Sequence, residues 1–223
     1  MDLICIIAAL IVTSLAQLIL TIKYKKYKKI EIDSGLTGKE VAEKILKEYD
    51  IDDIKVNEIS GNLTDNFNNG NRTLNLSSDI YNGTSVASTA VAAHECGHAI
   101  QYNEGYFPIK VRNTLVPVVN IGNKLGYIAI VISLAASLTK LFLVGIILIS
   151  FAVVFQLITL PVEFDASRKA KKVIKEMGLV NKKEHKGTKI MLRAAAFTYV
   201  AGLFSSILQI LRLIYIFNGR RRD

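Results

Sequence analysis

The most restrictive feature of this sequence is a run of twenty residues, 3–22, that contains no charged side chain. A helix of that length rises about 30 Å, which is the thickness of the hydrocarbon core of a lipid bilayer. Lysines follow the run within 23–29 and none precedes it, and this order favours an uncleaved anchor over a cleaved signal peptide. We therefore predict that residues 1–22 form a transmembrane helix.

Further apolar stretches lie in the second half of the chain. Residues 115–139 and 141–160 are each long enough to cross a bilayer, and only Lys140 separates them. This pattern predicts a tight transmembrane hairpin, which returns the chain to the side of the membrane that it left. A last stretch, 194–211, is also long enough to cross. We expect about four transmembrane helices.

The positive charge of the chain lies beside the apolar runs. The net charge is +9, with five lysines within 23–29 and ten Lys or Arg residues from Arg168 to Arg193. Such residues stay on the cytoplasmic side of a bacterial inner or plasma membrane, so both clusters place their segments in the cytoplasm. We therefore expect the basic residues to contact the headgroups of the lipid bilayer, and we expect no nucleic acid partner.

The orientation of the last apolar stretch is left open by the sequence. A single crossing puts the basic tail that includes Arg220, Arg221 and Arg222 outside the cell, against the charge rule. A helix that lies at the membrane interface keeps this tail inside. We favour the crossing.

The segment between the first two apolar regions, 23–114, carries signals of both helix and strand. Thr37 and Glu40 have the spacing of a capping box, which opens an amphipathic helix that runs to about Tyr49. This pattern indicates that a small folded domain begins after the anchor.

Two short runs in the same segment have the composition of strands, namely Ile54–Ile59 and Arg72–Leu76. Asn68-Asn69-Gly70 is a turn signal of the hairpin type. We expect Thr73–Leu76 to be an edge strand that takes the backbone of a substrate as an added strand.

The predicted fold is therefore a predominantly α-helical membrane protein with a small α+β cytoplasmic domain. The expected parts are an N-terminal anchor (1–22), a zincin-like cytoplasmic domain (23–114), a transmembrane hairpin (115–160), a basic cytoplasmic helix (161–193), and a C-terminal transmembrane helix with a basic tail (194–223).

The segment His94-Glu95-Cys96-Gly97-His98 carries the chemistry of the chain. Two histidines four residues apart lie on one face of a helix, where both rings can bind one metal ion. Glu95 is then free to act as the general base for a water molecule that zinc has acidified. This spacing is typical of zinc peptidases, whereas Cys96 is expected to pack against the protein rather than bind metal.

A catalytic zinc ion usually has three protein ligands, so another group must join the two histidines. We predict that Glu163 is this ligand, at the start of a helix that runs to Met177. An acidic residue at a helix start can instead serve the helix dipole. Iron also accepts two histidines and one carboxylate, but the glutamate within the motif favours zinc.

Two more residues are candidates for supporting roles. Asp165 can hold the second nitrogen of a ligating histidine, or it can be a solvated acid at a helix start. Tyr199 is a candidate donor to the oxyanion of the reaction, although a tyrosine near a membrane is often an anchor. The sequence does not decide either case.

Three stretches of the chain resemble the bacterial YugP-type membrane zinc metallopeptidases: Val91–Gln101, Leu160–Arg168 and Ala195–Ala201. The resemblance covers nearly the whole chain and implies a neutral zinc peptidase. The arrangement is also similar to the membrane metallopeptidases of the prenyl-protein and heat-shock types, in which an aspartate lies four residues after the glutamate ligand. Here that position is Ser167.

The sequence therefore predicts a membrane-anchored zinc endopeptidase with its active site on the cytoplasmic face, acting on protein or peptide substrates that can include membrane proteins. Two alternatives are an intramembrane metalloprotease, and an inactive scaffold or chaperone that is held together by zinc. The natural substrate and the oligomeric state are not indicated by the sequence.

Overall fold

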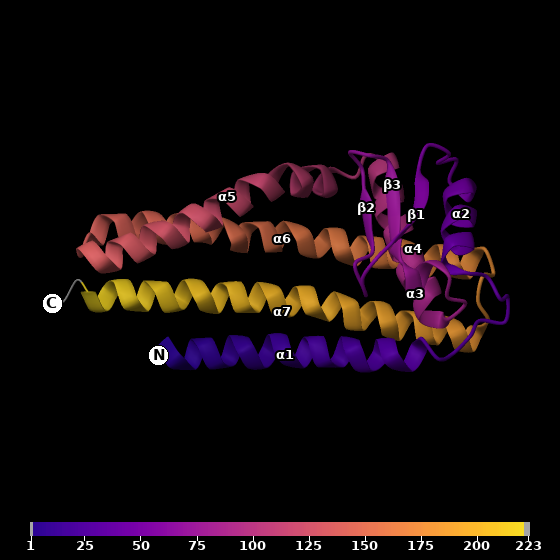
Figure 1. Cartoon of the computed structure of the whole chain (residues 1–223), viewed down its shortest axis with the longest axis horizontal. Coiled ribbons are helices and arrows are strands. Elements are labelled where there is room, and N and C mark those ends of the chain that lie inside the picture. Colours follow the sequence, from indigo (N-terminus) through magenta and orange to yellow (C-terminus); the bar gives the residue numbers. More distant parts are fainter. Residues whose placement is uncertain (1, 221–223) are drawn as a thin grey trace. The chain divides into compact units, whose positions relative to one another are not determined.

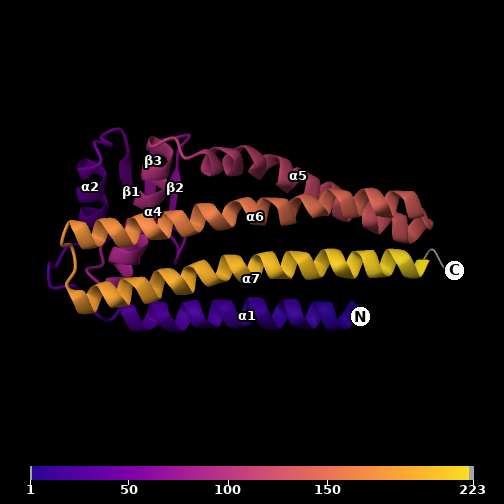
Figure 2. The ribbon, with the colours of Figure 1, turned by 180° about the vertical axis from the view of Figure 1, so that it is seen from behind.

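The computed structural model describes residues 2–220, which are drawn in Figures 1 and 2. Helices predominate, and the strands form one small sheet. The elements are α1 (Asp2–Tyr27), α2 (Gly38–Glu48), β1 (Lys55–Ile59), β2 (Asn66–Asn68), β3 (Thr73–Ser77), α3 (Ser78–Tyr81), α4 (Val86–Asn103), α5 (Phe107–Ala136), α6 (Thr139–Glu176) and α7 (Lys182–Arg220).

The chain divides into two compact units, which we describe separately. The first, here called the helical unit, comprises Met1–Gln17, Lys110–Pro161 and Thr198–Asp223. The second, here called the site unit, comprises Leu18–Ile109 and Val162–Phe197. All four long helices, α1, α5, α6 and α7, continue from one unit into the other, and α5 has only its first residues in the site unit.

The sheet of the site unit has the strand order β1-β3-β2. β1 is parallel to β3, with Lys55 opposite Thr73, and β2 is antiparallel to β3, with Asn66 opposite Asn75. β3 is therefore the central strand, and the prediction that Thr73–Leu76 lies at an edge is wrong. The strand β2 was not predicted because asparagine is depleted in strands, so the pairing with β3 outweighs local propensity.

The core of the site unit is formed by the sheet, by α2, α3 and α4, and by the parts of α1, α6 and α7 that belong to this unit. Thr37 and Glu40 make both hydrogen bonds of the predicted capping box, and α2 buries Val41 and Ile45. Cys96 on α4 is fully buried, with its Sγ 3.7 Å from the carbonyl oxygen of Ala42. Packing rather than metal binding is thus confirmed for this cysteine.

The helices α6 and α7 are longer than the sequence predicted. α6 continues through Pro161, so Glu163 lies inside this helix and the prediction that a helix begins near Glu163 is wrong. Proline leaves a helical carbonyl without its usual donor, but long apolar helices tolerate this. The basic segment is divided: its first part ends α6, and its second part, from Lys182, is joined to the last apolar stretch in α7.

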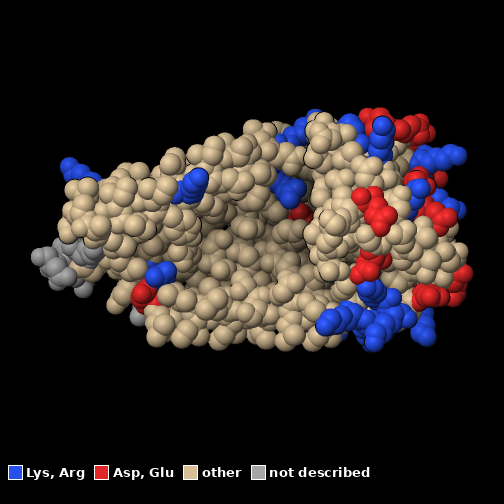
Figure 3. All heavy atoms as spheres, in the orientation of Figure 1, with Lys and Arg blue, Asp and Glu red and all other residues tan. Residues whose placement is uncertain are grey.

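Four helices of the described residues are long and apolar enough to cross a membrane: α1, α5, α6 and α7. In the helical unit, α5 and α6 form the predicted hairpin, and its turn lies at Ser137 and Leu138, just before Lys140. Ser133 donates a hydrogen bond of 2.8 Å to the Leu138 carbonyl oxygen. The surface of these helices is largely uncharged (Figure 3), as contact with lipid requires. Arg221 and Arg222, part of the basic tail, lie outside the described residues.

Candidate metal centre

Three side chains converge in the site unit: His94 and His98 of α4 and Glu163 of α6. One ligand atom from each lies within 4.8 Å of the other two. Glu163 is 1% exposed and His98 is 7% exposed. A charged group in such a position needs a partner, and a metal ion or a protonated imidazole can provide one.

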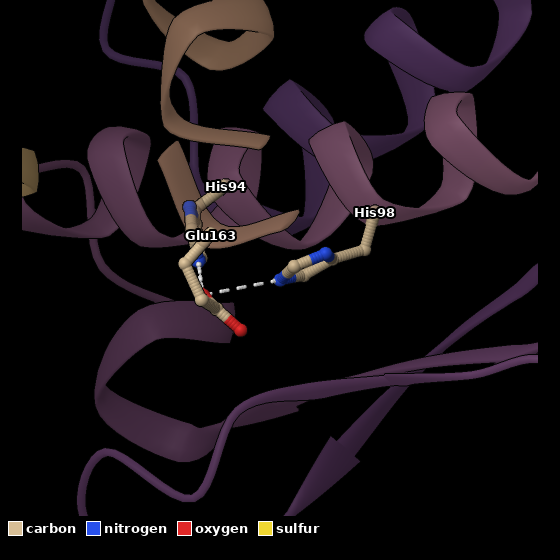
Figure 4. Close-up of side chains that lie close together, drawn as sticks. All are labelled: His94, His98 and Glu163. Carbon is tan, nitrogen blue, oxygen red and sulfur yellow. Dashed lines mark hydrogen bonds and ion pairs between the residues drawn. The ribbon is translucent and has the colours of Figure 1, made fainter. Parts of the chain in front are cut away.

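The two imidazole rings turn toward the same carboxylate, as Figure 4 shows. Nε2 of His94 lies 3.2 Å from Oε2 of Glu163, and Nε2 of His98 lies 3.6 Å from the same oxygen. The four-residue spacing on α4 produces this arrangement because residues i and i+4 share a helix face. The sequence-predicted ligands are therefore brought together by the fold.

A glycine allows α4 and α6 to approach closely enough for this contact. A Cβ atom on Gly97 would lie 2.6 Å from the carbonyl oxygen of Ala166, closer than real Cβ atoms come to backbone. Ala166 follows Glu163 by about one helical turn. The small residue within the motif thus lets Glu163 reach the histidines of the facing helix.

Glu95 lies next to the cluster and is 8% exposed. Burial raises the pKa of its carboxyl to about 7, and the nearby carboxylates of Glu163 and Asp65 act in the same direction. His94 and the backbone N–H of Phe67, on β2, partly offset this rise. A carboxyl with a pKa near neutral can both take and return a proton at physiological pH.

Other polar side chains contact the ligating histidines. Ser167 places its Oγ 3.3 Å from Nδ1 of His94, and Gln101 places its Oε1 3.0 Å from Nδ1 of His98. Asp165 is buried and bonds to Gln101, so it contacts His98 only through that residue. Of the two alternatives for Asp165, the burial of this residue excludes a solvated acid.

The role of Gln101 was missed from the sequence. A glutamine near the end of an amphipathic helix resembles any solvated polar residue, and burial is what distinguishes it. The one available signal was its spacing, because residues three apart are neighbours on a helix and Gln101 follows His98 by three.

Tyr199, the predicted oxyanion donor, lies on α7 in the helical unit and not in the unit that contains the metal cluster. Within the site unit, the rings of Phe67 and Tyr102 contact each other, with their centroids 6.5 Å apart. The role of Tyr199 stays a prediction.

The donor set fits zinc. Two imidazole nitrogens and one carboxylate oxygen are a common set of protein ligands for a catalytic zinc ion, and they leave a position for water. All three ligand atoms belong to buried or half-buried side chains that face one another. His94, His98 and Glu163 are thus suited to hold the ion.

The comparisons with known proteins agree with this geometry. Residues 2–218 match the model of the family described as "Putative neutral zinc metallopeptidase". The chain belongs to this family. It is also 40% identical over 215 residues to the "Putative membrane protease YugP" of Bacillus subtilis (strain 168), a match that covers 96% of each chain. No solved structure matches the chain.

Proposed function

We propose that the protein is a membrane-anchored zinc endopeptidase that hydrolyses peptide bonds on the cytoplasmic face of the membrane. The observation that carries this proposal is the convergence of His94, His98 and Glu163 beside a buried glutamate, Glu95. Membership of a zinc metallopeptidase family supports it. The long apolar helices and the name of the Bacillus relative support a location in the membrane.

In this proposal Glu95 is the general base. His94, His98 and Glu163 would hold the zinc ion, which would supply an acidified water molecule and polarise the carbonyl of the scissile bond. Glu95 takes the proton of the attacking water and later delivers it to the nitrogen of the leaving amine. The pKa of about 7 suits both steps because the two protonation states are then close in free energy.

The substrate backbone is proposed to bind along β2. This strand forms one edge of the sheet, and the N–H of its central residue, Phe67, faces the Glu95 carboxylate rather than β3. In an antiparallel ladder the groups of one residue point to the same side, so the carbonyl of Phe67 faces outward as well. An extended peptide can therefore pair with β2 next to the base.

Tyr199 is our proposed donor to the oxyanion. A Tyr199→Phe variant removes only the hydroxyl. If the hydroxyl acts on the transition state, kcat is expected to fall about 100-fold while zinc remains bound. Unchanged kcat would assign the tyrosine to the membrane interface instead.

The central test compares the wild-type protein with Glu95→Gln, both purified in detergent and loaded with zinc. Each is incubated with an unfolded reporter polypeptide, and the fragments are measured over time. We expect cleavage by the wild type alone, with zinc bound at about one equivalent to both proteins. Equal cleavage by Glu95→Gln would refute the role of Glu95. A zinc-loaded wild type that cleaves no reporter would favour the scaffold alternative.

A further inference from the structure

Gln101 makes an unusually complete set of contacts beside the metal cluster. Its side chain is fully buried. Nε2 lies 2.8 Å from the carbonyl oxygen of Val162 and 2.9 Å from Oδ2 of Asp165. Oε1 lies 3.0 Å from Nδ1 of His98. Both polar atoms of the amide therefore have partners: Nε2 faces two oxygen atoms of α6, and Oε1 faces a histidine of α4.

These contacts determine which of the two terminal amide atoms of Gln101 is the nitrogen and which is the oxygen. A backbone carbonyl can only accept a hydrogen bond, so the group that faces Val162 must be the NH₂ of Gln101. The carboxylate of Asp165 is also an acceptor and takes the second hydrogen of the same NH₂. Oε1 is thus left to face His98, and an amide oxygen can only accept.

The orientation of the amide fixes the proton on the histidine. Because Oε1 of Gln101 accepts, Nδ1 of His98 must be the nitrogen that carries hydrogen. In a neutral imidazole the other nitrogen, Nε2, then has the free lone pair. Nε2 is the atom that faces Glu163, at 3.6 Å.

We propose that Gln101, oriented by Asp165 and the Val162 carbonyl, is a positioning residue that holds His98 in its Nδ1-protonated form and presents Nε2 to zinc. This proposal rests on the metal site of the proposed function and deepens it. Nδ1 of His94 has no equivalent constraint, because the hydroxyl of Ser167 can either donate to or accept from it.

The first test needs no substitution of Gln101 or Asp165. The chain has only three histidines, so selective ¹⁵N labelling of histidine gives a simple spectrum. In zinc-free protein at about pH 8, where an ordinary histidine is neutral, we expect the His98 signals of the Nδ1-protonated form alone. The assignment uses His185→Gln and His94→Gln variants. Signals of the Nε2-protonated form, or an average of the two forms, would overturn the proposal.

The second test measures zinc affinity by competition with a chelator. Gln101→Met keeps the volume of the side chain and removes both hydrogen-bonding groups, and we expect affinity to fall about 10-fold to 100-fold. Asp165→Leu is expected to show a similar loss, and Asp165→Asn a smaller one because it keeps an acceptor. The matched control is Thr89→Val, which removes another buried hydrogen bond of α4.

The outcomes separate this proposal from the peptidase itself. Wild-type zinc affinity in a folded Gln101→Met protein would refute the positioning role of Gln101. Failure to cleave any reporter would contradict the peptidase proposal, but it would not affect the histidine spectrum or the zinc affinity. Folding of each variant is checked by circular dichroism and thermal unfolding. If Gln101→Met does not fold, the histidine spectrum of the wild-type protein still tests whether His98 is protonated at Nδ1.

Discussion

Glu95, the proposed general base, shows how a buried carboxyl can reduce the stability of the fold that holds it. Its pKa is about 7 in the folded protein, against the usual 4.5. At a pH between these two pKa values, the folded chain holds the proton of Glu95 more tightly than the unfolded chain does. The free energy of unfolding therefore falls as pH rises through this range, and it is level above the range. The proposed role of Glu95 as a general base offers a reason for a buried carboxyl at this position.

Replacing Glu95 by Gln is therefore expected to stabilise the zinc-free protein. Glutamine keeps the shape and an acceptor for the Phe67 N–H but never ionises. At about pH 8 the gain is on the order of 3 kcal/mol, and it falls toward zero near pH 5. Thermal unfolding of both proteins across this pH range provides the measurement. A difference that does not depend on pH would show that ionisation of Glu95 is not its cause.

Ser167 offers a second prediction at the scale of one residue. Its hydroxyl lies 3.3 Å from Nδ1 of His94. A carboxylate at this position makes a stronger, charge-assisted hydrogen bond than a hydroxyl does. We expect zinc affinity to increase in the order Ser167→Ala, wild type, Ser167→Asp, with steps of about 5-fold to 10-fold. Equal affinity of the alanine variant and the wild type would mean that the hydroxyl does not support His94.

At the scale of elements, the distance between α4 and α6 decides whether the site exists. Gly97→Ala adds a Cβ atom 2.6 Å from the Ala166 carbonyl oxygen, and two helix backbones must separate to relieve this clash. We expect zinc affinity to fall more than 10-fold and stability to fall by about 1–3 kcal/mol. Chelator competition and thermal unfolding measure the two effects.

Gly122→Ala is the matched control for this variant. Gly122 is also a helical glycine, on α5, but the nearest atom to an added Cβ there is 3.6 Å away. Alanine is a better helix former than glycine, so this control is expected to be neutral or to stabilise by up to about 1 kcal/mol. If Gly97→Ala behaves like Gly122→Ala, the close approach does not govern the position of Glu163.

The same elements show which parts of the fold the sequence could predict. The α4 motif, the capping box of α2 and the α5–α6 hairpin depend on residues close together in the chain, and local patterns therefore predicted them. The parallel pairing of β1 with β3 and the contact of Gln101 with Asp165 join distant segments. No local pattern encodes them, and the same holds for the continuity of α6 across Pro161.

At the scale of the whole molecule, four helices connect the apolar part of the chain to the part that contains the candidate metal ligands. α6 illustrates this most directly, because it contributes its first half to the hairpin and Glu163 to the site. The charged side chains gather on the site unit (Figure 3), and they include the lysines that follow the anchor. Positive residues remain in the cytoplasm, so this distribution favours a cytoplasmic site.

The orientation can be tested with single cysteines and a maleimide that does not cross membranes. Cys5 is replaced by Ser, and Cys96 is retained because it is buried. Asp52→Cys reports on the site unit, and Ser137→Cys reports on the turn between α5 and α6; both positions are exposed. In intact cells we expect Ser137→Cys to react, and Asp52→Cys to react only after permeabilisation. The reverse pattern would place the metal site outside the cell and contradict the charge rule.

A third label decides the orientation of the last helix. Gly219 is exposed near the end of α7, and a cysteine there meets open space. If α7 crosses the membrane from a cytoplasmic start, Gly219→Cys is expected to react in intact cells, as Ser137→Cys does. Reaction only after permeabilisation would keep the basic end inside and place the apolar part of α7 at the interface. The charge rule favours that second result, whereas the length of the apolar run favours the first, so this position measures which effect is stronger.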